Sequence, residues 1–372
     1  MAALNDRASG SVARSSAGTG VVAGAPGPVS TFAETAAQGD PLAAVLRSVR
    51  LTGALFFVVD ASSPWCGDIP HARAYAPIIF PRAEHIVSYH VIVEGTGFAS
   101  IPGVEPVSFE SGDIILFPHG DPYLMESTPG TEPEFDAAQT LDFFRELAAG
   151  RLPFVVREGG GAPPSAQFIC GFLGCDLRPF NPVLSSLPRM LRLRRSGAGG
   201  DVLDKLIELT LEEAQASRAG GESVRLRLSE LLFIELLRRY AGTPEQKPPG
   251  WLAGFQDGGV ARALQAIHNQ PQENWTVSGL ARAAGCSRSV LAARFTELVG
   301  HPPAGYLKLW RMQIASSMLS ETDEPIAEVG YRVGYASEAA FSRTFKKIAG
   351  VSPDGWRRAR RDQLARGALG AL

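Results

Sequence analysis

Two segments in the C-terminal part of the chain carry serine, glycine and aromatic residues in the same pattern. They span residues 280–300 and 329–350, and their matched residues are 50 positions apart. In each, a short amphipathic stretch leads to a turn glycine, a serine stands where a helix N-cap belongs, and a second helix carries a buried aromatic. This pattern is typical of a helix-turn-helix, whose second helix enters the DNA major groove. The matched pairs are Ser287 with Ser337, Phe295 with Phe345, Gly300 with Gly350, Pro303 with Pro353, and Tyr306 with Trp356.

A helical bundle with an internal repeat is the alternative, but it does not explain why turn glycine, capping serine and aromatic recur in register. Two such units contact successive major-groove turns, ~34 Å apart, if a stiff connector sets their spacing. Residues 304–319 suit that role, because Tyr306, Trp310 and Ile314 recur at four-residue steps.

The four cysteines offer a second chemistry, which is oxidation of a thiolate. Cys66 and Cys170 are the redox candidates, with burial as inert core residues as the alternative. No basic neighbour is placed to activate either thiol, and Cys66 has the acidic neighbour Asp68. Four scattered cysteines do not make a disulfide scaffold, so we expect a cytoplasmic protein.

Charge and composition divide the chain. The net charge is −2, but residues 258–372 hold 15 Lys and Arg against nine Asp and Glu, so only this part is basic. A basic C-terminal part is expected to meet a polyanion. No apolar run approaches the ~18 residues of a membrane span, and no secretion signal precedes the first strand.

The periodicity of the remaining chain predicts the elements around these motifs. Short apolar runs separated by Gly and Pro predict a small β-barrel, and two amphipathic helices follow at 201–216 and 222–240. Their apolar surface exceeds what a lone surface helix needs, which favours dimerisation or packing on the barrel. The predicted organisation is a disordered tail (1–38), a sensor domain (39–195), a helical dimerisation or packing segment (196–240), a linker (241–257), an all-α domain (258–362) and a second disordered tail (363–372).

Residues 325–358, from Pro-Ile-Ala-Glu-Val-Gly-Tyr to Gly-Trp-Arg-Arg, resemble the signature of AraC/XylS-type regulators. The resemblance covers residues 259–361 and implies an all-α DNA-binding domain with two helix-turn-helix motifs on a long central helix. By position in that motif, the recognition helices offer DNA the residues Arg288, Ser289, Ala292 and Ala293 in the first unit and Glu338, Ala339, Ser342 and Arg343 in the second. Arg294, Lys346, Lys347 and Arg357 are expected to contact phosphates, with a solvated surface charge as the alternative for each. The first helix departs from the family, since Ala292 and Ala293 stand where long polar side chains are common.

The segment from Gly112 to Tyr123 resembles the second motif of cupins, and residues 90–97 resemble a remnant of the first. The resemblance implies a cupin-like sensor barrel with an effector pocket at His90, Glu94, His119 and Tyr123. Cupin enzymes hold a metal with three histidines and a glutamate, whereas here Tyr123 and Ser88 stand near two histidine positions. A metal held by His90 and Glu94 is one interpretation. The other, in which His90 is a hydrogen-bonded barrel residue, requires no cofactor.

Together these patterns predict a transcription regulator rather than an enzyme. Its expected partners are double-stranded promoter DNA, a small-molecule effector or an oxidant, a second copy of the chain in a homodimer, and RNA polymerase if it is an activator. A cupin-type metal-dependent enzyme with a helical appendage is the alternative, and the incomplete ligand set argues against it. A partner-binding adaptor without DNA is a third hypothesis, which the two recognition helices disfavour.

Overall fold

The computed structural model describes residues 51–81, 83–160, 165–176, 179–194, 201–216, 218–242 and 250–369. The predicted tail at 1–38 lies outside these residues. The N-terminal domain contains β1 (Leu51–Ala61), β2 (Cys66–Ile69), α2 (Ala72–Ile79), β3 (His85–Glu94), β4 (Thr96–Ser100), β5 (Val107–Glu110), β6 (Asp113–Phe117), β7 (Tyr123–Glu126), α3 (Ala137–Ala148), β8 (Val155–Glu158), β9 (Ala166–Cys175), α4 (Pro182–Ser185), β10 (Leu191–Arg194), α5 (Val202–Ala216) and α6 (Gly221–Gly242). The C-terminal domain contains α7 (Trp251–Gln256), α8 (Gly258–Asn269), α9 (Val277–Ala284), α10 (Arg288–Val299), α11 (Pro303–Glu321), α12 (Ile326–Arg332), α13 (Glu338–Ala349) and α14 (Pro353–Leu369).

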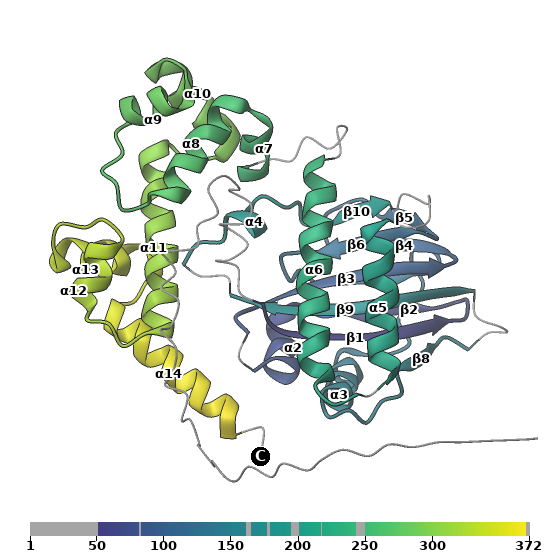
Figure 1. Ribbon diagram of the computed structural model, residues 1–372. Coiled ribbons are helices and arrows are strands. Elements are labelled where there is room, and N and C mark those ends of the chain that lie inside the picture. The colour runs from purple at the N-terminus through teal and green to yellow at the C-terminus, as the bar shows by residue number, and fades with distance from the viewer. Residues whose placement is uncertain are drawn as a thin grey trace, which may run out of the picture. The chain divides into compact units, whose positions relative to one another are not determined.

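The strands of the N-terminal domain form two sheets (Figure 1). The six-stranded sheet has the order β10-β6-β3-β9-β1-β8, and the four-stranded sheet has the order β2-β7-β4-β5. One core joins them, with Phe57 and Phe168 from the first sheet and Tyr123 and Met125 from the second. The predicted cupin-like β domain is therefore confirmed, with two packed sheets in place of one closed barrel.

Strand β3 lies inside the six-stranded sheet, between β6 and β9, and both of its faces are buried. Because side chains alternate along a strand, Ile86 and Ile92 point into the core shared with the second sheet. Val87, Tyr89 and Val91 belong to the core on the opposite face. This burial on both faces accounts for the Ile and Val residues of β3, and it requires partners inside the domain for the two buried polar residues Ser88 and His90.

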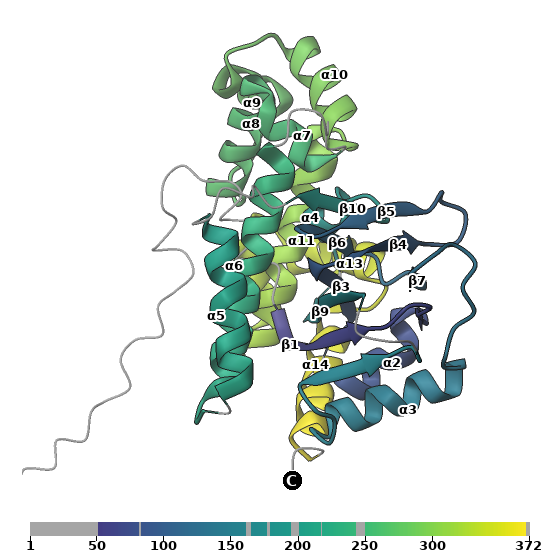
Figure 2. The same cartoon turned by 90° about the vertical axis from the view of Figure 1, so that its right-hand side faces the viewer.

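Helices α5 and α6 cover that opposite face of the six-stranded sheet (Figures 1 and 2). Leu203 and Ile207 of α5 and Leu236 of α6 pack into the same core as Val87 and Tyr89. The two predicted amphipathic helices therefore form, and their inward faces are used for packing on the sheet.

Two predicted segment boundaries differ from the structure. Residues 241–257 were expected to be a linker, but α6 continues to Gly242, and α7 begins at Trp251 because Trp251 and Leu252 are buried. Residues 243–249 lie outside the described part of the chain. The expected disordered tail at 363–372 is also incorrect over most of its length, since α14 continues as a helix to Leu369.

The C-terminal domain is organised around α11 (Figure 1). The N-terminal half of α11 contributes Tyr306 and Trp310 to the core of α8, α9 and α10. Its C-terminal half contributes Met312 and Leu319 to the core of α12, α13 and α14. One continuous helix thus holds both units, as the periodicity of residues 304–319 predicted.

Candidate nucleic-acid interface and the core of the N-terminal domain

The first helix-turn-helix unit consists of α9 and α10. Gly285 ends α9 in the left-handed region, with φ of 67° and ψ of 35°, where a residue with a Cβ atom is strained. Ser287 then caps α10, because its Oγ accepts a hydrogen bond from the backbone N–H of Val290 at 3.3 Å. The predicted turn glycine and capping serine therefore both perform their expected roles.

The second unit, α12 and α13, repeats this construction. Ser337 caps α13 through a 3.3 Å hydrogen bond from the N–H of Ala340. The aromatic packing repeats as well, since Phe295 meets Tyr306 edge-on with ring centroids 5.8 Å apart, and Phe345 meets Trp356 in the same way at 5.8 Å. The sequence repeat therefore corresponds to a repeat of tertiary contacts.

Arg311 of α11 links the two units, although no sequence motif marks this residue. Its guanidinium donates hydrogen bonds to the carbonyl oxygens of Pro271 (2.7 Å) and Glu273 (2.9 Å) in the loop before α9. It also donates to the carbonyl of Gly334 in the turn of the second unit, at 3.2 Å. An arginine next to Trp310 in an amphipathic helix gives no local signal of these contacts, because its acceptors lie 23 to 40 residues away.

The predicted DNA-facing side chains lie on the accessible sides of the two second helices. On α13, Glu338, Ala339 and Arg343 are exposed and Ser342 is half-buried, while Phe341 and Phe345 face inward. On α10 the exposed or half-buried residues are Arg288, Ser289, Ala292 and Ala293. Each second helix therefore presents its first two turns, which is the part that a major groove accepts.

The predicted phosphate-contacting side chains fall into two groups. Arg294 forms an ion pair with Asp257 at 2.5 Å, and Arg357 donates to the carbonyl oxygen of Glu324 at 2.5 Å. Both arginines therefore have structural partners within the domain. Lys346 and Lys347 are exposed on α13 and enter none of the ion pairs found among the described residues.

A buried chain of polar side chains crosses the core between the two sheets. The ring nitrogens of His90 lie 3.1 Å from the sulfur of Cys170 and 2.9 Å from the hydroxyl of Tyr123. On the same strand, the Oγ of Ser88 lies 3.1 Å from the hydroxyl of Tyr75 in α2. Burial lowers the pKa of His90 to about 3, so the imidazole is neutral. Ser88 and Tyr123, the two departures from the cupin ligand pattern, thus each bond another buried side chain, Tyr75 and His90 respectively.

The described residues add no third ligand to the predicted metal site at His90 and Glu94, which stays a prediction. Both ring nitrogens of His90 are within hydrogen-bond distance of side chains. Glu94 is exposed at the end of β3. It stands four residues from His90, and four residues along a strand span roughly 13 Å. Among the described residues, no three His, Cys, Asp or Glu side chains are grouped to hold a metal ion. Of the four predicted pocket residues, His90 and Tyr123 lie together in the core, whereas Glu94 is exposed and the Nε2 of His119 lies 2.8 Å from the carbonyl oxygen of Leu187.

Comparison with known proteins agrees with this geometry. Residues 40–242 match the model of a cupin family, and residues 280–359 match the model of a helix-turn-helix domain. A putative AraC-like transcription regulator of Streptomyces lividans is 28% identical over 323 residues, which are 86% of this chain and 98% of that protein. The chain is an AraC/XylS-family transcription regulator with an N-terminal cupin domain. The DNA-binding function therefore belongs to the C-terminal domain of this regulator.

Further similarities of the regulator are of the same kind. The HTH-type transcriptional regulator AlkR of Acinetobacter baylyi is 27% identical over 320 residues, which cover 86% of this chain and 99% of that protein. Among solved structures, the DNA-binding domain of AdpA in complex with a target DNA is 29% identical and covers 29% of this chain and 96% of that chain, with a TM-score of 0.27. The relatives AlkR and the Streptomyces protein are transcription regulators, so the regulator is assigned to this class and not to the cupin-type enzymes. None of the helices in its described part has the length and apolar character that a bilayer crossing requires.

The two redox candidates of the regulator are buried thiols. Cys66 in β2 and Cys170 in β9 are 2% and 5% exposed, and all four cysteines are free. Burial raises the pKa of Cys66 to about 12, and the carboxylates of Glu126 and Glu158 add to the shift. Burial also raises the pKa of Cys170. A thiol with a raised pKa holds little thiolate at neutral pH, so neither environment activates the sulfur.

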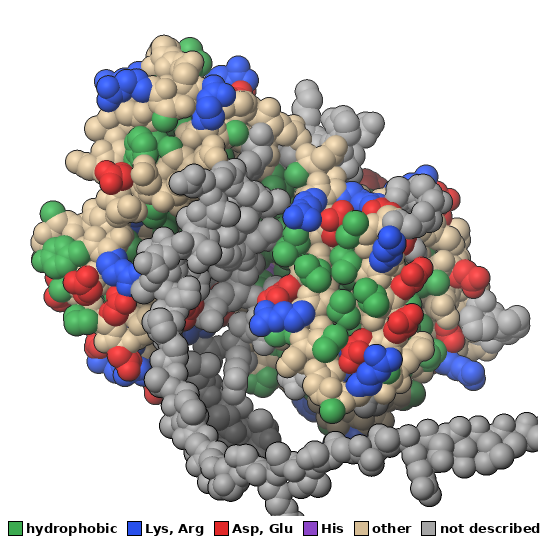
Figure 3. All heavy atoms as spheres, in the orientation of Figure 1, with side chains coloured by type: hydrophobic (Ala, Val, Ile, Leu, Met, Phe, Trp, Pro, Cys, Tyr) green, Lys and Arg blue, Asp and Glu red, His purple; other side chains and the backbone are tan. Residues whose placement is uncertain are grey.

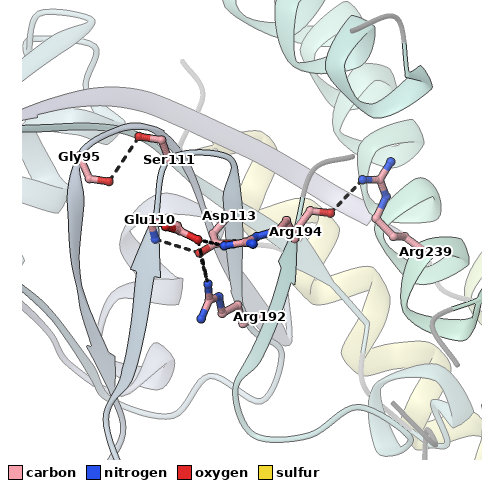
Figure 4. A network of polar contacts seen from close by, with 7 residues as sticks. All are labelled: Gly95, Glu110, Ser111, Asp113, Arg192, Arg194 and Arg239. Carbon is pink, nitrogen blue, oxygen red and sulfur yellow. Dashed lines mark hydrogen bonds and ion pairs between the residues drawn. The ribbon is translucent and has the colours of Figure 1, made fainter. Parts of the chain in front are cut away.

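An ion-pair network joins the edge of the six-stranded sheet to α6 (Figure 4). The fully buried carboxylate of Asp113 pairs with Arg192 at 2.8 Å and accepts a hydrogen bond from the N–H of Glu110 at 2.8 Å. Burial raises the pKa of Asp113, and the hydrogen bond and charge of Arg192 act in the opposite direction. The next arginine on β10, Arg194, accepts a hydrogen bond at its carbonyl from Arg239 of α6 at 3.0 Å. The second cupin-like motif, which begins with Gly112-Asp113, therefore anchors β10 and α6.

Proposed function

We propose that the regulator binds promoter DNA with the first turns of α10 and α13 and changes its action when an effector reaches the N-terminal domain. The observation that carries this proposal is the pair of helix-turn-helix units on α11, each presenting the open side of its second helix. In this proposal α13 makes the polar base contacts, with Arg343 as the main one. Helix α10 makes fewer polar contacts, because Ala292 and Ala293 offer only apolar contact with thymine methyl groups.

The test is retention of promoter fragments by the purified full chain and by a fragment containing residues 250–372, each measured over a range of salt concentrations. Binding should weaken linearly with the logarithm of salt, because phosphate contacts release counterions. A folded C-terminal fragment that retained no promoter DNA at low salt would contradict the proposal.

We propose a small molecule, rather than an oxidant, as the effector. The raised pKa values of the buried thiols Cys66 and Cys170 disfavour oxidation. A ligand that displaced the contact between His90 and Tyr123 would meet these two polar groups among aromatic side chains. A ligand of matching chemistry is an apolar molecule with one polar group. Candidate compounds should raise the melting temperature of the full chain, and Tyr123→Phe should weaken that effect. A response that survives Tyr123→Phe but disappears in Cys170→Ser would favour oxidation instead.

We also propose that the regulator is a homodimer through the outward faces of α5 and α6. Figure 3 shows hydrophobic side chains gathered over these helices with charged side chains around them. Val202 and Leu209 on α5 are 56% and 49% exposed, and Val224 and Leu231 on α6 are 43% and 49% exposed. Apolar side chains in such a patch favour burial against a second copy.

Light scattering of the full chain tests the dimer. Leu209→Asp combined with Leu231→Asp should give a monomer, whereas Val104→Asp, at an exposed apolar residue outside these helices, should not. A wild-type chain that stays monomeric at high concentration would remove this part of the proposal.

We also propose that the regulator is cytoplasmic, where the DNA is, and that it activates transcription through RNA polymerase. Measuring transcription from the bound promoter with and without the regulator tests the proposed activation.

A further inference from the structure

A basic groove lies between α11 and α13 in the C-terminal domain. Its volume is about 550 Å³. Lys308 of α11 and Arg343 and Lys347 of α13 line it, together with His301 from the turn before α11. Leu309 and Ile348 contribute apolar side chains. Of these residues, only Arg343 and Lys347 belong to the motif positions that were predicted to contact DNA.

The positive charge of this groove is not compensated locally. No Asp or Glu lines it, and Lys308, Arg343 and Lys347 enter none of the ion pairs found among the described residues. Other arginines of the same domain do have carboxylate partners. Arg332 pairs with Glu324 at 2.5 Å, and Arg358 pairs with Asp354. A concave surface with three uncompensated cations concentrates anions.

The groove continues the predicted recognition surface toward the first helix-turn-helix unit. Arg343 and Lys347 are one turn apart on α13, so they share the flank of the recognition helix that meets α11. Lys308 is exposed in the N-terminal half of α11, the half that carries the first unit. A duplex bound by both units has a minor groove between its two occupied major-groove segments, and phosphate strands border that minor groove.

We propose that this groove holds the phosphodiester backbone of the DNA between the two major-groove segments, with Lys308 and Lys347 as its principal cations. This inference rests on the proposed function, since it requires that both units bind one duplex. Lysine ammonium groups act as point charges toward phosphate and read no base, so the groove contributes affinity and register without sequence preference. Arg343 belongs both to the predicted base-contacting residues of α13 and to the lining of the groove.

A mutant cycle between protein and DNA tests the site. Lys308→Gln and Lys347→Gln are compared with Arg73→Gln, an exposed arginine of α2 in the N-terminal domain. Each protein is titrated with the promoter duplex and with duplexes in which single phosphates between the two protected major-groove segments are replaced by neutral methylphosphonates. Melting temperatures show that the variants remain folded, as expected for exposed side chains.

Each lysine variant should lose about three- to tenfold in affinity and reduce the salt slope by about one, with unchanged discrimination between promoter and mutated promoter. Neutralising a phosphate that a lysine contacts should weaken DNA binding by the wild type and by Arg73→Gln. It should have little further effect on the variant that lacks that lysine. Equal sensitivity of all proteins to every methylphosphonate would overturn the inference while leaving DNA binding intact.

Two other outcomes also decide the matter. If inorganic phosphate or a fatty carboxylate raises the melting temperature of the wild type but not of Lys308→Gln, and the methylphosphonate cycle shows no coupling, the groove is a small-anion site and the inference is wrong. If the folded wild type binds no promoter duplex, the proposed function fails as well.

Discussion

The guanidinium of Arg311 donates a hydrogen bond to the carbonyl oxygen of Gly334 across 3.2 Å. The same side chain reaches the carbonyl oxygens of residues 271–273 on the other unit. Gly334 has φ of 87°, and a Cβ atom there would lie 2.5 Å from the carbonyl oxygen of Gln272 and 2.7 Å from Arg311. This point of close approach therefore fixes the two helix-turn-helix units relative to α11.

Replacing Arg311 by alanine should loosen the link between the two units. The hydrogen bonds to the carbonyl oxygens of Pro271 and Gly334 are partly buried, so we expect the unfolding free energy to fall by about 1–3 kcal/mol. Arg311→Lys should recover little of the lost stability, because one ammonium group cannot reproduce the several planar N–H donors of a guanidinium. Urea unfolding of the full chain measures this effect, and Arg361→Ala, which removes an exposed ion pair with Asp323, is the control. Equal stability of Arg311→Ala and the control would show that the link is dispensable.

Arg343 and Lys346 should respond differently to alanine substitution if their predicted roles are correct. Arg343→Ala should cost about 1–3 kcal/mol on the promoter and relax the preference at one base pair, because a base contact is lost. Lys346→Ala should weaken binding to all sequences equally and flatten the salt dependence. Titrations of promoter and single-base variants at several salt concentrations distinguish the two. Identical behaviour of the two variants would contradict this division of roles.

Gly171→Ala should destabilise the N-terminal domain. Gly171 on β9 pairs with Tyr89 on β3, and a Cβ atom at residue 171 would lie 2.0 Å from the tyrosine ring. Because the ring is buried, it cannot move without disturbing the core, so we expect a loss of about 1–3 kcal/mol. Gly160→Ala is the matched control, since a Cβ atom there meets nothing within 4 Å. Thermal unfolding of both variants checks the prediction, and Tyr89→Leu combined with Gly171→Ala should recover part of the loss.

Glu158 should make stability depend on pH. Burial, with added repulsion from Glu134, raises its pKa from 4.5 to about 7 in the folded protein. The folded state therefore keeps a proton between pH 4.5 and 7 that the unfolded state has lost, so the free energy of unfolding falls as pH rises through this window. Glu158→Gln should remove that fall and stabilise the protein by about 1–3 kcal/mol above pH 7, with the difference vanishing toward pH 4.5.

Denaturant unfolding at several pH values measures this effect, with the exposed Glu132→Gln as the control. The two variants would have parallel pH profiles if Glu158 ionised as an ordinary surface carboxylate.

Local patterns in the sequence were sufficient for the C-terminal domain. Turn glycines, capping serines and aromatic periodicity act within a few residues, so both helix-turn-helix units and the connecting α11 were predicted correctly. The same type of evidence failed at residues 251–256, where the Gly- and Pro-rich composition indicated a linker. Burial of Trp251 and Leu252 stabilises α7 there, and no local pattern shows what they pack against.

The sequence by itself determined the family, the repeated DNA-binding units and the β character of the N-terminal domain, because these follow from short-range spacing. Only the tertiary structure decided what the polar residues of the N-terminal core do. His90 meets Cys170, which is 80 residues away, because β3 pairs with β9 in antiparallel register and sets the two residues opposite each other. Glu94 lies roughly 13 Å along the same strand from His90, although a spacing of four positions suggested a shared ligand site. Strand pairing brings distant residues together and holds near ones apart, and it depends on how the whole domain packs.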